Sequence, residues 1–424
     1  MEKSAYREKL KKSETTENSL LIGSWVTFFP FDIESYEKQL DRMAAAGLNF
    51  SLFPYNFGSP AEYADGTWDY VEEQYAKRNM LYHVNASMNR DYIEKAVKNA
   101  DGKAHCIGYH LIDEPADSRL EEVAELTHIF RKLDPKRYPF TNLFPSYVGE
   151  AGRGGSYRHY AEHYVKSAGI ENIDYLSHDF YPFRGEHDVG YDIFADMEVI
   201  RSVAYENGRL KTHAFPQSTA WTGMRMPNID EMRWNVYAYL VYGFKALSWF
   251  NYVCPGRTDD EGERFRECLI YRDGNIHNPE LFEKWSELNW EIRGLSDALM
   301  SLDTVHAYHT EKNVADVEYL PDGFFIKPAK NADVIIGCMT AKDRSDPYIM
   351  IFNKSTTEEL KDAEFVIDTA CGVESAEYLN PHTGEYIPMN ISGGKFADSF
   401  DKGEGKLYRL KGNFDINKLF DIRP

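Results

Sequence analysis

The chain has 424 residues, of which 43% are hydrophobic and 27% are charged, the values of an ordinary globular protein. It carries 48 Lys and Arg residues against 68 Asp and Glu residues, which gives a formal net charge of −20. This charge argues against nucleic acid as a partner, because phosphate binding needs a basic surface. No apolar run of about 18 residues or more occurs, so we expect no membrane span and no membrane partner.

Five cysteines are scattered singly along the chain: Cys106, Cys254, Cys268, Cys338 and Cys371. Their odd number, their wide spacing and the lack of a CxxC pair suggest neither a zinc site nor a disulfide framework, and fit a reducing compartment. Residues 1–19 are polar and charged, without the apolar stretch of a signal peptide. We therefore expect a cytoplasmic protein, with the alternative of an exported protein whose signal peptide has been removed.

Eight short apolar runs, most of them followed by an amphipathic helical pattern, occupy about the first 300 residues. The runs are Leu20–Pro30, Leu48–Asn56, Met80–Ser87, Cys106–Glu114, Tyr138–Ser146, Asn172–Phe183, Leu210–Trp221 and Phe244–Gly256. Alternation of strand and helix predicts a parallel sheet with crossover helices. Eight such units in about 280 residues match the size of a (β/α)8 TIM barrel.

The pattern changes after about residue 303, where short segments alternate between apolar and polar residues and are separated by Pro and Gly turns. We predict hairpins over 317–327 and 375–389, and an antiparallel β-sandwich for this part of the chain. The predicted fold is therefore α/β. It has a polar N-terminal segment at 1–19, a catalytic (β/α)8 barrel at 20–302 and a C-terminal antiparallel β-sandwich at 303–424.

Aromatic residues make up 14% of the chain, and several stand at predicted strand ends beside Asn, Gln, His and carboxylate residues. In a (β/α)8 barrel the functional residues lie at the C-terminal ends of the strands. Since aromatic faces complement the apolar faces of sugar rings, these ends predict a carbohydrate site. The predicted substrate-binding residues are Trp25, Asn56, His83, His178, Tyr181, Gln217, Trp221, Trp249 and Asn251. The aromatic members would wall the sugar subsites, and Gln217 and Asn251 would bind sugar hydroxyls.

Asp113 and Glu114 end the fourth apolar run, and Asp179 stands near the end of the sixth. Burial at a strand end raises the pKa of a carboxyl group, and an adjacent carboxylate raises one of the two further. A general acid near neutral pH needs such a raised pKa. Opposed carboxyl groups across a barrel mouth are the arrangement used for glycoside hydrolysis. We therefore predict Glu114 as the general acid, with Asp113 or Asp179 as its partner.

No HExxH or similar spacing links the histidines, so no metal and no other cofactor is expected. A site built from His83, His178 and Asp179 stays open as an alternative and would fit a metal-dependent sugar lyase or isomerase. The segment 152–155, Gly-Arg-Gly-Gly, lacks the strand–helix context of a phosphate loop and is interpreted as a flexible loop.

The segment 107–115, with the sequence IGYHLIDEP, resembles the fourth-strand motif of barrel glycoside hydrolases in the clan of the cellulases and β-galactosidases. The strand ends at His178, Tyr181 and Trp249 are also similar to that clan. Its members carry an Asn-Glu pair on the fourth strand, with Glu as acid/base, which implies this role for Glu114. The clan places its nucleophilic Glu at the end of strand 7, where this chain has Gln217, and an amide cannot be the nucleophile.

Three alternatives would replace the missing nucleophile. The adjacent Asp113 and Glu114 resemble those of N-acetylhexosaminidases, in which the acetamido group of the substrate attacks; Asp113 would orient that group. Alternatively, Asp179 acts with Glu114. A base for an inverting reaction could also come from the loop after the eighth strand, which carries Asp259, Asp260, Glu261 and Glu263.

The sequence thus predicts a glycoside hydrolase acting on an oligo- or polysaccharide, without predicting an oligomeric state. The runner-up is a non-catalytic carbohydrate-binding barrel that has lost its nucleophile. The metal-dependent sugar lyase or isomerase is the third interpretation.

Overall fold

A computed structural model describes residues 2–13, 19–26, 33–54, 66–86, 88, 90–254, 265 and 267–422. Contacts divide the chain into two compact units. The barrel unit comprises Leu21–Pro227 and Ala246–Asn289, and the sheet unit comprises Met1–Leu20, Asn228–Lys245 and Trp290–Pro424. The domain boundaries expected from the sequence stay a prediction. Among the described residues, no helix is long and apolar enough to cross a membrane.

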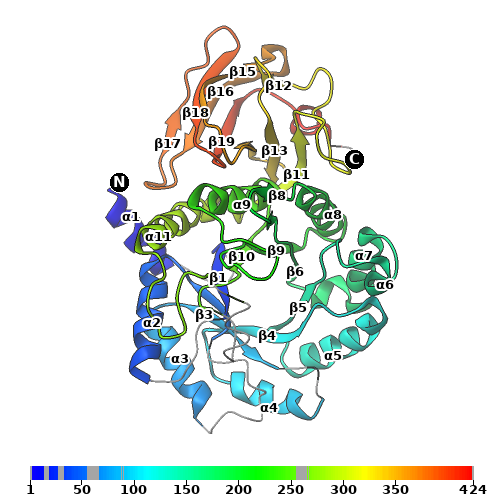
Figure 1. The fold of residues 1–424 in the computed structure, drawn as a ribbon. Coiled ribbons are helices and arrows are strands. Elements are labelled where there is room, and N and C mark those ends of the chain that lie inside the picture. Colours follow the sequence, from blue (N-terminus) through cyan, green and yellow to red (C-terminus); the bar gives the residue numbers. More distant parts are fainter. Residues whose placement is uncertain are drawn as a thin grey trace. The chain divides into compact units, whose positions relative to one another are not determined.

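Eight parallel strands of the barrel unit close into a barrel in the order β1-β10-β9-β6-β5-β4-β3-β2 (Figure 1). They are β1 (Leu21–Val26), β2 (Phe50–Phe53), β3 (Leu81–Asn85), β4 (Cys106–Asp113), β5 (Tyr138–Leu143), β6 (Tyr175–Asp179), β9 (Lys211–Phe215) and β10 (Ala246–Trp249). Each predicted apolar run contains one of these strands. Most strand residues are buried because a parallel barrel is covered on both faces, and buried polar ones such as Ser177 and His213 contact one another.

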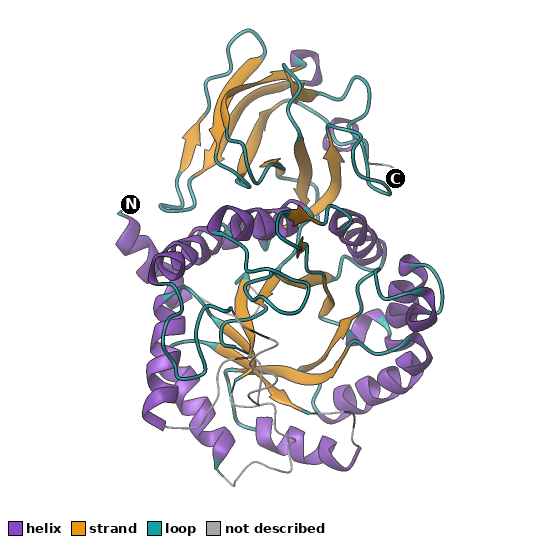
Figure 2. Ribbon diagram, in the orientation of Figure 1, coloured by secondary structure: helices purple, strands orange, loops and turns teal. Residues whose placement is uncertain are grey.

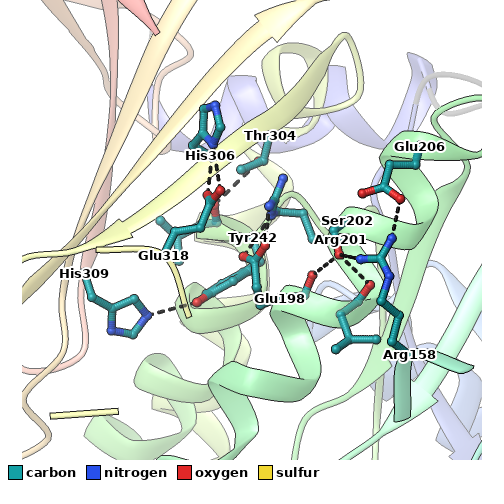
Figure 3. Close-up of polar contacts among 12 residues, drawn as sticks. Arg158, Glu198, Arg201, Ser202, Glu206, Tyr242, Thr304, His306, His309 and Glu318 are labelled. Atoms are coloured by element: carbon teal, nitrogen blue, oxygen red, sulfur yellow. Dashed lines mark hydrogen bonds and ion pairs between the residues drawn. The ribbon is translucent and has the colours of Figure 1, made fainter. Parts of the chain in front are cut away.

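Helices surround the barrel strands on the outside (Figure 2). They are α2 (Ile33–Ala45), α3 (Thr67–Lys77), α4 (Arg90–Ala100), η2 (Asp117–Arg119), α5 (Leu120–Leu133), α6 (Glu150–Arg153), α7 (Tyr157–Ala168), η3 (Ile170–Asn172), α8 (Ile193–Glu206) and the start of α11 (Pro279–Arg293). Arg158 of α7 donates to Ser202 Oγ of α8 at 3.1 Å and pairs with Glu206 (Figure 3). A short hairpin of β7 (Phe183–Arg184) and β8 (Asp188–Val189) follows β6.

The sheet unit contains two antiparallel sheets. The six-stranded sheet has the order β11 (Leu302–His309), β13 (Val334–Ala341), β14 (Pro347–Asn353), β19 (Gly405–Gly412), β16 (Val373–Leu379) and β17 (Tyr386–Pro388). The three-stranded sheet has the order β12 (Ile326–Pro328), β15 (Leu360–Ile367) and β18 (Lys395–Phe400). The sheets pack together through Phe396 and Tyr408, whose ring centroids lie 5.5 Å apart. The predicted fold class, a TIM barrel followed by antiparallel β-structure, is confirmed.

Helices α1 (Lys3–Ser13), α9 (Ile229–Val241), α12 (Ser296–Leu299), η4 (Thr369–Cys371) and α13 (Ile416–Leu419) complete the sheet unit. Trp234 of α9 donates its indole N–H to the carbonyl of Lys354 at 2.8 Å. Tyr242, directly after α9, contacts His309 of β11 at 2.9 Å (Figure 3). Both contacts join α9 and its end to the six-stranded sheet, so this helix belongs to the sheet unit by its packing.

One of the two predicted hairpins is wrong. Residues 317–320 form no strand, and β12 pairs with β15 instead. The Pro-Asp-Gly turn at 321–323 is a local signal, whereas the partner of β12 is a distant strand that a local pattern cannot specify. The hairpin at 375–389 is confirmed, because β16 pairs with β17 in antiparallel register.

Trp249 lies at the end of β10 and faces outward from the barrel. It is 0% exposed, its indole N–H donates to Asn289 Oδ1 at 2.9 Å, and its ring meets Trp285 of α11 edge-on at 5.9 Å. The preceding Ser248 faces the barrel interior, where it contacts His213 at 2.9 Å. Because successive side chains of a strand point to opposite faces, Trp249 cannot also face the interior. The prediction that Trp249 walls a sugar subsite is therefore wrong.

Replacement of Trp249 tests this placement. Trp249→Ala should lower the free energy of unfolding by about 3–5 kcal/mol, the cost of removing a large buried side chain. Urea denaturation followed by far-ultraviolet circular dichroism measures the loss. The control is Tyr271→Ala, because Tyr271 is 40% exposed in the same unit and should cost much less. Equal small losses in both variants would contradict the buried position of Trp249.

Candidate active site

A pocket of about 380 Å³ lies at the C-terminal ends of the barrel strands. Its lining combines aromatic side chains with three carboxyl groups and one amide. The lining residues are Trp25, Asp113, Glu114, Asn142, Tyr147, Val148, Asp179, Tyr181, Phe215, Trp221, Met224, Phe250 and Phe265. Six of the predicted site residues are therefore brought together: Asp113, Glu114, Asp179, Trp25, Tyr181 and Trp221.

Three neighbouring strands position the carboxyl groups. Asp113 is the last residue of β4, Glu114 follows it, and Asp179 is the last residue of β6. Asn142 of the intervening β5 donates from Nδ2 to Asp113 Oδ1 at 3.1 Å and to Asp179 Oδ1 at 3.2 Å. The parallel strands end at the same side of the barrel, so residues far apart in the sequence meet around one amide group.

The side chains of Glu114 and Asp179 are hydrogen-bonded to each other. Burial and, after it, the neighbouring charge of Asp113 raise the pKa of Glu114 to about 7, whereas the hydrogen bond with Asp179 acts to lower it. Burial and the facing charge of Glu114 together raise the pKa of Asp179 well above its ordinary value. Two buried carboxyl groups in contact cannot both ionise without strong repulsion. One proton is therefore held between Glu114 and Asp179 near neutral pH.

Asp113 is the most exposed residue of the three acidic residues, whereas Asp179 is only 7% exposed. The carboxyl group of Asp113 is nevertheless surrounded by protein atoms, and desolvation is the main cause that raises its pKa to about 7. The charge of Asp179 also raises the pKa of Asp113, whereas the hydrogen bond from Asn142 lowers it.

Glu114 has a left-handed backbone conformation, with φ of 47°. Its N–H donates to the carbonyl of Asn142 at 2.9 Å, which fixes this turn against β5. A non-glycine residue in this region costs on the order of 1–3 kcal/mol, and such strain is concentrated at functional sites. The turn places two successive carboxyl groups, those of Asp113 and Glu114, in the same pocket.

A buried chain of hydrogen bonds fixes the orientation of Asn142. Its Oδ1 accepts from Ser177 Oγ at 2.9 Å, Ser177 Oγ lies 2.8 Å from His213 Nδ1, and His213 Nε2 lies 2.9 Å from Ser248 Oγ. Burial lowers the pKa of His213 to about 3, so this ring is neutral. Since Oδ1 of Asn142 faces the Ser177 donor, its NH₂ group must face the carboxylates.

Aromatic side chains wall the pocket around the carboxyl groups. The rings of Tyr181 and Trp221 meet edge-on at 4.8 Å, and those of Trp25 and Phe215 meet edge-on at 5.3 Å. Tyr181 also donates a hydrogen bond to Asp179, so one wall residue is tied directly to the carboxyl pair. The pocket thus combines aromatic walls with a cluster of carboxyl groups.

The two histidines predicted to bind substrate, His83 and His178, do not line the pocket. His83 is buried and contacts Tyr138 Oη at 3.1 Å, whereas His178 faces α7 and contacts Tyr157 Oη at 3.2 Å. His178 stands between Ser177 and Asp179, both of which face inward, so strand alternation turns it outward. The predicted substrate contacts of His83 and His178 are therefore wrong, and so is the alternative metal site that combined them with Asp179.

Two predicted sugar-binding amides instead hold backbone segments together. Gln217 is 0% exposed; its Nε2 donates to the carbonyl of Arg225 at 2.8 Å, and its Oε1 accepts from the N–H of Phe183 at 3.2 Å. Asn251 is also 0% exposed and accepts from Ser24 Oγ at 2.9 Å. Neither residue lines the pocket, so the predicted substrate contacts of both are wrong.

Some predicted residues lie outside the part of the chain that the structure describes, and some residues of the pocket were not predicted. Asn56, Asp259, Asp260, Glu261 and Glu263 lie outside the described residues. Seven lining residues are not among the predicted ones: Asn142, Tyr147, Val148, Phe215, Met224, Phe250 and Phe265. A polar Asn near the end of an otherwise apolar run was the available signal for Asn142. The other six are aromatic or aliphatic residues, and no sequence pattern distinguishes such residues in a pocket from those in the core.

The sequence matches no known family model, and no curated protein sequence is matched. Solved structures do match the fold. A β-galactosidase from Bacillus circulans sp. alkalophilus gives a TM-score of 0.61 at 9% identity over 95% of this chain and 100% of that chain. A protein described as a glycoside hydrolase gives a TM-score of 0.55 at 12% identity, over 95% of this chain and 97% of that chain.

A family 5 glycoside hydrolase from Bacteroides vulgatus ATCC 8482 gives a TM-score of 0.54 at 12% identity, over 93% of this chain and 89% of that chain. At these identities the likeness is one of fold. The chain thus shares the barrel architecture of several glycoside hydrolases.

Proposed function

We propose that the protein is a glycoside hydrolase that cleaves a glycosidic bond of an oligo- or polysaccharide in the barrel pocket. The observation that carries this proposal is the hydrogen-bonded pair of Glu114 and Asp179, set beside Asp113 and between aromatic walls. Glycosidic bond cleavage needs a carboxyl group that is protonated near neutral pH and can reach the leaving-group oxygen. The fold shared with glycoside hydrolases supports the same reaction class.

Glu114 is the proposed general acid. Burial raises its pKa to about 7, so it holds a proton at a pH where an ordinary Glu is ionised. It is also more open to the pocket than Asp179, which is 7% exposed. A glycosidic oxygen bound in the pocket would accept the proton that the pair now holds between its own two carboxyl groups.

Asp113 is the proposed partner that faces the substrate. The acid and its partner are about 5–9.5 Å apart in retaining and inverting enzymes, which is longer than a hydrogen bond between carboxyl groups. Asp179 touches Glu114, so its proposed task is to adjust the pKa of the acid rather than to attack the sugar. Asp113, open to the pocket, would orient a substrate acetamido group or activate water.

A non-catalytic carbohydrate-binding barrel is the second candidate. The observation that favours it is the use of Gln217 by backbone groups, so that this position after strand β9 brings no carboxylate into the pocket. Both candidates would bind sugar against Trp25, Tyr181 and Trp221. Turnover of aryl glycosides separates them, because only the hydrolase releases the aryl alcohol.

Removal of the Glu114 proton should abolish most activity. Glu114→Gln keeps the shape of the side chain and is expected to lower kcat/KM by about 10²–10⁴ on a substrate with a poor leaving group. The matched control is Glu150→Gln, an exposed carboxylate of the same unit, which should keep the wild-type rate. Melting temperatures check folding. A loss of less than tenfold would remove Glu114 from the acid role.

The pH dependence of kcat/KM should show an alkaline limb near pH 7. Burial raises the pKa of Glu114 to about 7, so the proton is present below that pH and is lost as the pH rises through it. The limb belongs to the coupled carboxyl pair as a whole. A glycoside with a good leaving group needs no proton and should show a weaker limb. A limb near pH 4.5, the ordinary Glu value, would contradict the raised pKa.

Gln217→Glu should not restore a strand-7 nucleophile. The new oxygen would replace an N–H donor that faces the carbonyls of Thr219 and Arg225, at 3.3 and 2.8 Å. Two buried acceptors would then face each other, at a cost of about 1–3 kcal/mol in the free energy of unfolding. We expect a lower melting temperature and no gain in aryl glycosidase rate. A tenfold gain in rate would show that residue 217 reaches the pocket.

A further inference from the structure

Two histidines and a carboxylate gather where η2 meets α7, outside the pocket. Asp117, His159 and His163 each offer one ligand atom, and these atoms lie within 4.8 Å of one another. In the part of the chain that the structure describes, this is the one group of three such side chains. Nothing in the proposed hydrolysis uses these residues.

Helix α7 presents both histidines on one face, because they are four residues apart. The ring centroids of His159 and His163 lie 5.9 Å apart, and His163 Nδ1 lies 2.7 Å from Asp117 Oδ1. Two imidazoles four residues apart on a helix can bind one metal ion together, with a third ligand from another element. Here Asp117 of η2 is in place as that third ligand.

A second carboxylate orients His163. Its Nε2 lies 3.2 Å from Glu121 Oε1, and Ser167 Oγ donates to the same Glu121 oxygen at 2.6 Å. When Nε2 donates its proton to Glu121, the lone pair of Nδ1 points toward Asp117. Histidines that bind metal ions are commonly held in this way by a carboxylate on the other ring nitrogen.

Gly154 and Gly155, which lie between α6 and α7, make room for two of the three side chains. A Cβ atom at Gly154 would lie 2.3 Å from Asp117 Oδ2, and one at Gly155 would lie 3.3 Å from His159 Cδ2. Gly154 also has a left-handed backbone, with φ of 67°. This gives a structural reason for the Gly-Gly sequence that the sequence analysis could assign only to a loop.

We propose that Asp117, His159 and His163 bind a divalent cation of the zinc class, with water as the fourth ligand. Two imidazoles and one carboxylate suit Zn²⁺ or a related transition metal, whereas Mg²⁺ and Ca²⁺ prefer oxygen ligands. Ligand atoms around tetrahedral zinc lie roughly 3.3 Å apart, given bonds of about 2.0 Å. The cluster needs only small side-chain movements to reach that separation.

The bound ion would fasten η2 to α7. Asp117 follows Glu114, the proposed general acid, by three residues, so the bound ion would stabilise the segment directly after Glu114. Its ligands do not line the pocket, and the site is therefore independent of the proposed hydrolysis. Binding to the folded state alone raises the melting temperature, which gives a readout besides activity.

Calorimetric titration of the tag-free full chain with Zn²⁺ tests the proposal, with thermal melting in Zn²⁺, in Mg²⁺ and in a chelator. We expect one Zn²⁺ per chain, a rise in melting temperature with Zn²⁺, and no rise with Mg²⁺. His159→Ala and His163→Ala should lose this binding. Glu121→Gln should weaken it by about 10–100-fold, the usual effect of removing an orienting carboxylate.

His187→Ala is the matched control, because His187 is an exposed histidine of the same unit and should leave Zn²⁺ binding unchanged. Melting in chelator shows whether each variant is folded; His159 is exposed, so its replacement should be tolerated. No saturable binding by the wild type would overturn the proposal. So would equal Zn²⁺ affinity and stoichiometry in the wild type and in a double variant lacking His159 and His163.

Discussion

The hydrogen bond between the carboxyl groups of Glu114 and Asp179 is the interaction on which the proposed chemistry depends. It exists because burial at the ends of β4 and β6, on either side of β5, brings the two carboxyl groups together where two full charges would repel. Asn142 offsets part of the remaining charge by donating to Asp113 and Asp179 at once. The hydrogen-bonded series of Ser177, His213 and Ser248 keeps the amide of Asn142 in the required orientation.

Strand alternation decides which residues take part in this arrangement. Ser177 and Asp179 of β6 face the barrel interior and the pocket, and His178 between them faces α7. In β10, Ser248 faces inward and Trp249 packs against Trp285 outside the barrel. Within a regular strand, the side chain next to an inward-facing residue therefore lies on the opposite face. Asp113 and Glu114 share the pocket because the chain turns at Glu114, directly after β4.

The sequence predicted the barrel well because its signal is local and is repeated eight times. The carboxyl groups of Asp113, Glu114 and Asp179 could be predicted because charged residues at the end of a buried strand are rare unless they have a functional role. Trp249 could not be placed, because composition at a strand end does not reveal the direction of a side chain. The role of Gln217 depends on backbone groups of other segments, among them the N–H of Phe183, and the partner of β12 is the distant strand β15.

Hydrolysis itself is the central claim, and a product spectrum tests it most directly. The full chain would be incubated with an array of aryl glycosides and oligosaccharides, and the released sugars and their anomers would be followed by NMR. Our account predicts that at least one glycoside is cleaved and that a single product anomer appears first, as expected when fixed carboxyl groups act on one face of the sugar. Binding of sugars in the pocket without cleavage of any glycoside would contradict it and would identify a carbohydrate-binding barrel instead.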